Sequence, residues 1–232
     1  MPIHKSVPSY LRQFIREQRL KANSRLPSER FLLQTFGSSR VTIRETLGRL
    51  EAEGLIYRQN RKGWFVSPPR FQIDLTRKID FTAMALAQSR VPSTEVLHIR
   101  RVTAPVKMLE PLELARGAMV YELRRVRALD GRPIMMEDIY LNARQFDGIE
   151  LHDLNGSITR VQREQFGAQF TSELSTIRVV TLSEKQAGSL SVNPGAPCLN
   201  ILRTRFDERR KPIDYNIEHW LHNSIEMTVD SR

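Results

Sequence analysis

Residues 38–66 constrain this chain most, because they specify a helix, its end and a following hairpin without interruption. Ile43, Leu47 and Leu50 recur at the i, i+4, i+7 spacing that turns one apolar face of a helix toward a core. Gly54 stands where a left-handed residue commonly ends a helix. The pattern therefore predicts an amphipathic helix that packs on other elements and stops at Gly54.

A basic hairpin is predicted directly after this helix. Two short apolar runs, Leu55–Tyr57 and Trp64–Val66, flank a cationic tip. The tip cations are Arg58, Arg61 and Lys62. The polar face of the helix carries Arg40, Thr42, Arg44 and Arg49. A helix with an Arg/Thr face followed by a basic β-wing is the layout of a winged helix-turn-helix that binds DNA. The alternative is a solvated charged helix beside an ordinary hairpin.

Two further helices are expected before this stretch. Leu11, Phe14 and Ile15 give the first one an apolar face. Ser28 can cap the second one, and Gly37 ends it. Three helices and a wing then fill roughly the first 70 residues, which is enough for one small domain.

The charge of the chain is concentrated in this N-terminal part. Residues 1–70 hold 14 Lys/Arg against 5 Asp/Glu, whereas residues 71–232 hold 22 against 21. A polyanion bound by the N-terminal part is the natural reason for such a separation. No 18-residue apolar run and no signal peptide is present, so we expect no membrane partner. The single cysteine, Cys198, excludes an internal disulfide and fits a cytoplasmic protein.

Three motifs in this part carry a family resemblance. LPSER, GSSRVTIRETLGRLEAEGLI and RKGWFV, in this order, resemble the DNA-binding domain of the GntR family of bacterial transcription regulators. The resemblance implies DNA contacts at Ser28, Arg30, Arg40, Thr42, Arg44 and Gly63. Arginine can bond guanine O6 and N7, and hydroxyls suit phosphates or base edges. We expect the tip cations Arg58, Arg61 and Lys62 to add affinity for the DNA backbone.

A proline-rich segment predicts the domain boundary. Ser67-Pro68-Pro69-Arg70 reads as a stiff, extended junction. We therefore expect a winged helix-turn-helix domain over residues 1–68, a linker over 69–92 and a second domain over 93–232. The linker has some order, since Asp80–Ala87 can form a short helix.

The second domain reads as strands and helices interspersed. Two hairpins are predicted, around Asp130-Gly131-Arg132-Pro133 and around Asp207–Lys211. Helices are predicted over 156–166 and 183–190, and further strands over 95–104, 175–182 and 225–229. This mixture with antiparallel hairpins is an α+β domain.

This part also carries a resemblance, over about residues 93–230. VYELRRVRALDGRPIMMEDIYL, GSITRVQREQFG and RFDERRKPIDYNIEHW resemble the ligand-sensing UTRA domain of the HutC subfamily, which shares its fold with chorismate lyase. The resemblance implies a small acidic effector in a cleft of an antiparallel sheet. The residues that would line the cleft are Arg125, Arg127, Glu137, Ser157, Thr159, Asp214 and Trp220.

The residues themselves fit an anion site. Arg125 and Arg127 are two apart in a strand, so both guanidiniums leave the same face and can form a bidentate clamp. Ser157 at a helix start adds a hydroxyl and free backbone N–H groups. The alternative is an Arg pair on a solvated sheet face. Glu137 can meet an amine or hydroxyl of the effector, or neutralise the Arg pair.

The sequence as a whole predicts a homodimeric transcription regulator bound to a two-fold symmetric double-stranded operator. The resemblance to the HutC subfamily implies that this regulator is a repressor. Sugar phosphates, phosphonates and carboxylates all fit the clamp as effectors. An enzyme of chorismate-lyase-like fold is one rival, but no catalytic residues can be named. A nonspecific DNA-binding protein is the other. No cofactor and no metal is expected, because His219 and His222 would face opposite sides of a strand.

Overall fold

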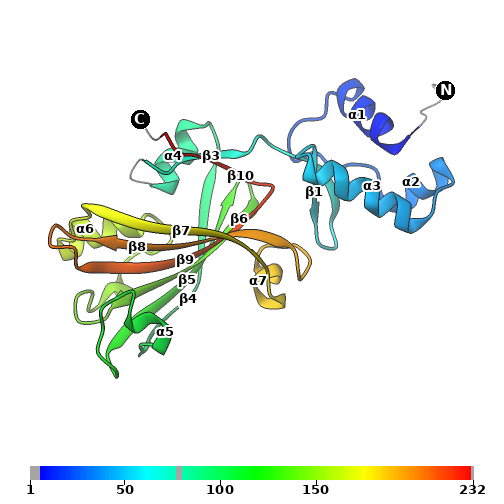
Figure 1. Ribbon diagram of the computed structural model, residues 1–232. Coiled ribbons are helices and arrows are strands. Elements are labelled where there is room, and N and C mark those ends of the chain that lie inside the picture. Colours follow the sequence, from blue (N-terminus) through cyan, green and yellow to red (C-terminus); the bar gives the residue numbers. More distant parts are fainter. Residues whose placement is uncertain (1–5, 77–79, 231–232) are drawn as a thin grey trace. The chain divides into compact units, whose positions relative to one another are not determined.

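The computed structural model describes residues 6–76 and 80–230, and its chain divides into two compact units, Met1–Arg70 and Phe71–Arg232 (Figure 1). Within the described residues no helix has the length and apolar character needed to cross a membrane.

The first unit is a winged helix-turn-helix. Its elements are α1 (Val7–Glu17), α2 (Glu29–Phe36), α3 (Arg40–Ala52), β1 (Ile56–Gln59) and β2 (Gly63–Val66). The strands β1 and β2 pair antiparallel and form the wing. The three helices and the hairpin predicted from the sequence are all present.

Side-chain caps explain where these helices begin and end. The hydroxyls of Ser6, Ser28 and Ser39 accept backbone N–H groups at the starts of α1, α2 and α3. Gly37 and Gly54 follow α2 and α3 with positive φ angles of 60° and 78°, a conformation that suits glycine. The predicted capping by Ser28 and the two predicted glycine stops are confirmed.

The apolar stripes of the three helices meet in one core. Its fully buried members are Leu11, Leu32, Ile43, Leu47, Leu50 and Ile56. Truncating one such leucine to alanine typically costs about 2–5 kcal/mol. The helix predicted from Ile43, Leu47 and Leu50 is therefore anchored by the face that the spacing indicated.

The second unit contains a six-stranded antiparallel sheet with the strand order β4-β5-β6-β9-β8-β7 (Figure 1). The strands are β4 (Pro92–Thr103), β5 (Met119–Leu129), β6 (Arg132–Asn142), β7 (Ser172–Thr181), β8 (Pro197–Phe206) and β9 (Pro212–Leu221). Both predicted hairpins, β5–β6 and β8–β9, are confirmed, and the fold is α+β as expected.

The two faces of the sheet have different covers. On one face α6 (Ile158–Phe166) packs with odd-numbered β5 residues such as Leu123. On the other face, even-numbered residues such as Val126 and Val120 pack with two helices. These helices are α7 (Glu184–Ser189) and α5 (Val106–Leu109), and a short 3-10 helix, η1 (Ile149–Leu151), lies before α6. The alternation of strand side chains thus separates two environments.

The expected linker over 69–92 is wrong, because these residues belong largely to the second unit. β3 (Phe71–Asp74) pairs in parallel with β10 (Ile225–Thr228), and α4 (Phe81–Ala87) packs beside them. The rings of Phe71 and Phe81 lie 6.4 and 6.3 Å from the ring of Trp220. Burial of these rings contributes stabilising free energy on the order of kilocalories per mole. It therefore holds the segment against the sheet.

Candidate functional site

The exposed face at the start of α3 carries polar side chains and the apolar side chain of Val41. Arg40, Thr42 and Arg44 are exposed, as predicted for residues that touch DNA. The Thr42 backbone N–H donates to the Ser39 hydroxyl at 3.1 Å, so the start of α3 is held in place. Val41 is 65 % exposed beside them. Sequence reasoning missed it, although an apolar residue outside the buried stripe was a visible signal.

Glu29 connects α2, α3 and the wing. Its carboxylate accepts from Arg44 Nε at 3.0 Å and from Trp64 Nε1 at 3.1 Å. Burial alone would raise the pKa of Glu29, but the hydrogen bonds from Trp64 and Arg44 and the charges of Arg44 and Arg58 lower it. Glu29 therefore stays ionised and holds Arg44 at the surface of α3.

The wing carries two kinds of cation. The Arg58 guanidinium lies 5.8 Å from the centroid of the Trp64 ring and 4.0 Å from the Glu29 carboxylate. Arg61 and Lys62 are exposed at the tip, and neither has an ion pair within the described residues. Arg58 is thus part of the root of the wing, whereas the tip cations are available to a partner.

Gly63 and the start of α2 complete the predicted DNA-facing set. Gly63 has a φ of 107°, which L side chains rarely adopt, so the path of the wing needs a glycine there. Ser28 is exposed and accepts the Phe31 N–H at 3.2 Å, which leaves its own hydroxyl proton to donate. Arg30, two residues later on α2, is exposed.

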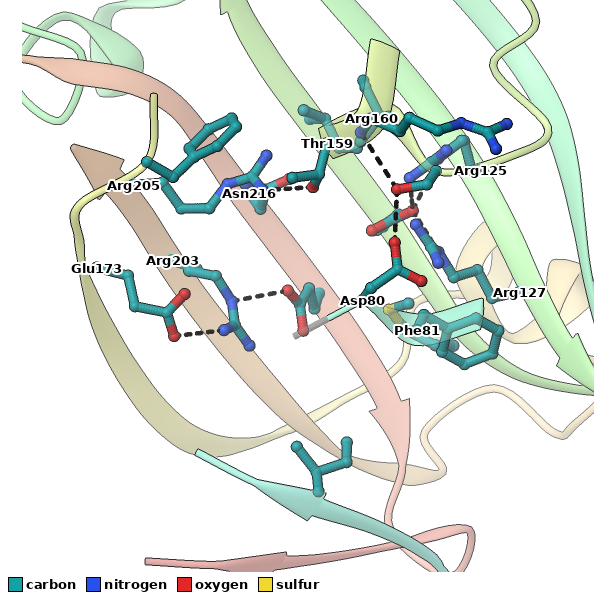
Figure 2. A pocket seen from close by; sticks show the side chains of 18 of the residues that line it. Asp80, Phe81, Arg125, Arg127, Thr159, Arg160, Glu173, Arg203, Arg205 and Asn216 are labelled. Atoms are coloured by element: carbon teal, nitrogen blue, oxygen red, sulfur yellow. Dashed lines mark hydrogen bonds and ion pairs between the residues drawn. The ribbon is translucent and has the colours of Figure 1, made fainter. Parts of the chain in front are cut away.

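A cavity of about 690 Å³ lies in the second unit, on the α6 face of the sheet (Figure 2). Residues from β3, α4, β5, β6, α6, β7, β8 and β9 line it. Six of the seven predicted effector residues are among them: Arg125, Arg127, Glu137, Ser157, Thr159 and Trp220. Its apolar lining includes Ile73, Phe81, Met135, Ile158 and Phe170.

Glu137 holds the two arginines of β5 together. Arg125 Nε and Arg127 Nε both donate to the same oxygen, Oε1 of Glu137, at 2.8 Å. Burial would raise the pKa of Glu137, yet the charges of Arg125 and Arg127 and their hydrogen bonds lower it to about 2. Of the two roles considered for Glu137, the structure shows neutralisation of the Arg pair.

The two arginines differ in what remains free. Arg125 is fully buried, and its Nη1 donates to the carbonyl oxygens of Leu154 at 2.8 Å and Gly156 at 3.0 Å. Burial and the charge of the neighbouring Arg127 lower the pKa of Arg125, and Glu137 raises it, so that the pKa is lowered to about 10. Arg127 packs 4.8 Å above the Phe81 ring, and its terminal nitrogens make no hydrogen bond within the described residues. Arg127 is therefore the better anchor for a ligand.

Ser157 caps α6 and contacts an acidic residue that sequence reasoning did not select. Its hydroxyl accepts the Arg160 N–H at 3.3 Å and donates to Asp80 Oδ2 at 2.7 Å. The other carboxylate oxygen of Asp80 accepts the Ala83 N–H at 2.8 Å and so caps α4. Figure 2 shows the Asp80 carboxylate turned toward the helix start that carries Thr159 and Arg160.

Two further arginines, also missed, line the opposite side of the cavity on β8. Arg203 donates to Glu218 at 3.1 Å and to Glu173 at 2.7 Å (Figure 2). Arg205 lies 4.2 Å from the centroid of the Phe170 ring. The spacing of two that singled out the first pair applies equally to Arg203 and Arg205, so the signal was present in the sequence.

Two predicted effector residues act on Arg205. Thr159 accepts from Arg205 Nη1 at 2.6 Å, and Asp214 accepts from Arg205 Nε at 2.9 Å. Asp214 is fully buried, also accepts from Gln162 at 2.8 Å, and is absent from the cavity lining. The prediction that Asp214 lines the cleft is therefore wrong: the carboxylate lies behind Arg205 and orients it.

Trp220, on β9, forms part of the cavity wall. Its indole N–H donates to Glu218 Oε2 at 2.7 Å, while Glu218 Oε1 receives Arg203. The ring is only 3 % exposed. Among the residues that the structure describes, no three His, Cys, Asp or Glu side chains are grouped so as to hold a metal ion.

Comparisons with known proteins identify both units. "Bacterial regulatory proteins, gntR family" matches residues 4–66, and "UTRA domain" matches residues 87–226. The HTH-type transcriptional regulator YihL of Escherichia coli K12, named as uncharacterized, is 27% identical over 207 residues, 89% of this chain and 88% of that protein.

A second relative and a solved structure agree with these matches. The probable fructoselysine utilization operon transcriptional repressor of Escherichia coli K12 is 26% identical over 213 residues, 91% of this chain and 87% of that protein. The crystal structure of PhnF from Mycobacterium smegmatis shares the fold, with a TM-score of 0.69 at 21% identity over 98% of this chain and 99% of that one. The chain belongs to the GntR family of bacterial transcription regulators and carries a UTRA domain.

Proposed function

We propose that this chain is a repressor whose operator affinity falls when a small anionic metabolite enters the cavity of the second unit. The observation that carries the proposal is the Arg125–Glu137–Arg127 cluster, which faces the same cavity as Ser157 at the start of α6. One relative is named as a probable repressor, which supports the sign of the regulation. A regulator of bacterial genes works beside the chromosome, so we place it in the cytoplasm, on the nucleoid when bound.

An anionic group fits the cavity for electrostatic reasons. Arg127 keeps terminal N–H donors toward the cavity, and a guanidinium can bind a carboxylate or phosphate with two parallel hydrogen bonds. The N-terminus of α6 adds the positive end of a helix dipole. Sugar phosphates, phosphonates and carboxylates are therefore the effector classes to test, and about 690 Å³ is a usual size for a small-molecule site.

The DNA-facing set supports sequence-specific binding by a homodimer. One recognition helix with Arg40, Thr42 and Arg44 exposed touches only a few base pairs. That is too little to select one site among roughly 10⁶ competitors. Two heads on a two-fold symmetric operator, with half-sites about one helical turn apart, double the information read.

Arg127→Ala is the test of the effector site. Glu137 would still be paired with Arg125, so the fold tolerates this change better than the loss of the fully buried Arg125. We expect the variant to bind operator DNA like the parent and to lose its response to the active metabolite in a gel-shift assay. The matched control is Arg144→Ala, which removes an exposed arginine away from the cavity.

Three results would decide against the proposal. If calorimetry shows Arg127→Ala binding the active metabolite as tightly as the parent, the effector site lies elsewhere. If the parent converts the metabolite to a product, the enzymatic alternative of chorismate-lyase-like fold is favoured. Equal affinity for operator and scrambled DNA at several salt concentrations would favour the nonspecific DNA-binding alternative.

A further inference from the structure

Asp80 lies where an anionic ligand of the cavity would be expected. Its Oδ2 accepts the hydroxyl proton of Ser157 at 2.7 Å, at the N-terminus of α6. Ser157 and Arg127 are the groups that the proposed function assigns to the effector anion, and both line the cavity together with Asp80. The protein therefore already holds one carboxylate against these donors.

The charge of Asp80 is maintained in this position. Burial would raise the pKa of Asp80, but the hydrogen bonds from Ala83 and Ser157 and the charge of Arg127 lower it. Asp80 is consequently ionised at neutral pH. Its negative charge acts on the same guanidinium, Arg127, whose remaining donors face the cavity.

We propose that Asp80 is a built-in competitor of the effector, whose carboxylate occupies the Ser157 hydroxyl and the field of Arg127 until the effector's anionic group displaces it. This inference rests on the proposed function. A serine hydroxyl has a single proton to donate, so Ser157 serves either Asp80 or the incoming anion. Two anions at one helix N-terminus also repel each other, which makes the exchange exclusive.

The displacement of Asp80 has a path to the rest of the chain. Asp80 is the N-cap of α4, and the next residue, Phe81, packs against Arg127 and Trp220. The chain reaches α4 through β3, which starts at Phe71 directly after the first unit ends at Arg70. Releasing Asp80 therefore changes the segment through which the second unit is covalently joined to the DNA-binding unit. In this way the competition weakens the binding of the effector and at the same time couples effector binding to operator binding.

Asp80→Asn in the full-length chain tests the competition directly. The amide oxygen of asparagine can keep the cap on Ala83, while its NH₂ group cannot accept from Ser157 and can itself donate to an anion. With inorganic phosphate as the probe, titrated calorimetrically at constant ionic strength, we expect binding to be about tenfold tighter or more, the size of a charge-assisted hydrogen bond regained.

The matched control separates competition from simple electrostatics. Glu164→Gln also removes one negative charge from the cavity lining, but Glu164 is exposed on α6 and has no contact with Ser157 or Arg127 in the described structure. We expect a change of about twofold or less, as for other exposed charges. If Glu164→Gln tightens phosphate as much as Asp80→Asn does, the inference is overturned.

Two more variants make the result independent of one substitution. Asp80→Ser keeps a residue that caps helices well and removes the carboxylate, so it should also tighten phosphate binding. In a Ser157→Ala background the gain in phosphate affinity from Asp80→Asn should be smaller, because the hydroxyl for which Asp80 and phosphate compete is absent. An undiminished gain in that background would overturn the inference.

The outcomes also separate this inference from the proposed function. If phosphate binds none of the variants or the parent, the anion site itself is wrong and both proposals fail. If phosphate binds the parent and requires Arg127, but Asp80→Asn and Asp80→Ser bind it no more tightly, the competition alone is wrong. Phosphate binding by Asp80→Asn with none detectable in the parent supports both.

Discussion

The unpaired surface arginines of the first unit and the cavity arginines of the second unit lie in opposite surroundings. In the first unit Arg40 and Arg61 are exposed, with no ion pair within the described residues. In the second unit Arg125 and Arg203 are buried, and each donates a hydrogen bond to a glutamate. Arg205 donates to an aspartate, Asp214. The same residue type therefore serves two different physical purposes in one chain.

The difference follows from the ligand that each surface meets. DNA carries many phosphates at the surface, and a hydrated, mobile cation can neutralise one of them and release counterions. A metabolite enters a cavity, where a desolvated cation must be paired to be tolerated and held to be specific. Exposed arginines should thus matter for affinity and little for stability, and the carboxylates that pair the buried arginines should matter for the fold.

The largest expected effect is on the stability of the second unit. Glu137→Gln leaves Arg125 and Arg127 without their shared carboxylate, and breaking a buried ion pair in this way typically costs about 3–5 kcal/mol. Urea denaturation followed by circular dichroism measures it. Glu164→Gln, exposed in the same cavity, should leave the midpoint nearly unchanged. Equal midpoints for the two variants would contradict the contrast between the units.

The dependence of stability on acidic pH should also show the contribution of the Glu137 carboxylate. The pKa of Glu137 is about 2 in the folded chain against 4.5 for a free glutamate, so the unfolded chain binds more protons between these values. The stability that Glu137 contributes is therefore fully present above about pH 4.5 and is lost as the pH falls toward 2. Denaturation midpoints measured down to pH 3 should fall less steeply in Glu137→Gln than in the parent. Parallel curves would show that Glu137 is not the group responsible.

Local patterns explain which parts of the fold the sequence predicted. The hairpin predicted around Asp207–Lys211 forms between the strands Pro197–Phe206 and Pro212–Leu221, because prolines and a polar turn bound these strands. The strand Phe71–Asp74 was not recognised, although Phe71 and Ile73 alternate with polar residues. Its partner, Ile225–Thr228, lies about 150 residues later, so nothing nearby indicates the pairing.

The residues of the candidate site likewise divide into those that a local sequence pattern predicts and those that it does not. The strand period placed Arg125 and Arg127 on one face, and the cap position placed Ser157 beside them. The contact of Ser157 with Asp80 joins residues 77 positions apart, and no local pattern reports it. The position of Asp214 behind Arg205 was also not predictable from a local pattern, since only the strand register places Asp214 directly opposite Arg205.

The next effect in size concerns operator recognition. Arg44→Ala removes a guanidinium that Glu29 holds at the exposed face of α3. We expect a loss of about 1–3 kcal/mol on the operator and a blurred preference at one base position. Thermal stability should change little, because the Arg44 side chain is exposed. Equal losses on operator and scrambled DNA would show that Arg44 contacts phosphate instead of a base.

The smallest effect is expected at the tip of the wing, where Lys62 is exposed and has no partner within the described residues. A lysine that neutralises one phosphate contributes about 0.9 to the slope of log affinity against log salt concentration. Lys62→Ala should therefore flatten that slope by about one unit and weaken operator and scrambled DNA alike. Fluorescence anisotropy over a salt series measures both quantities, with Lys107→Ala in the second unit as the control for a lost lysine outside the DNA-binding unit. An unchanged slope in Lys62→Ala would mean that an exposed, unpaired cation of this unit does not contact DNA. The contrast between the exposed and the buried cations would then fail for this lysine.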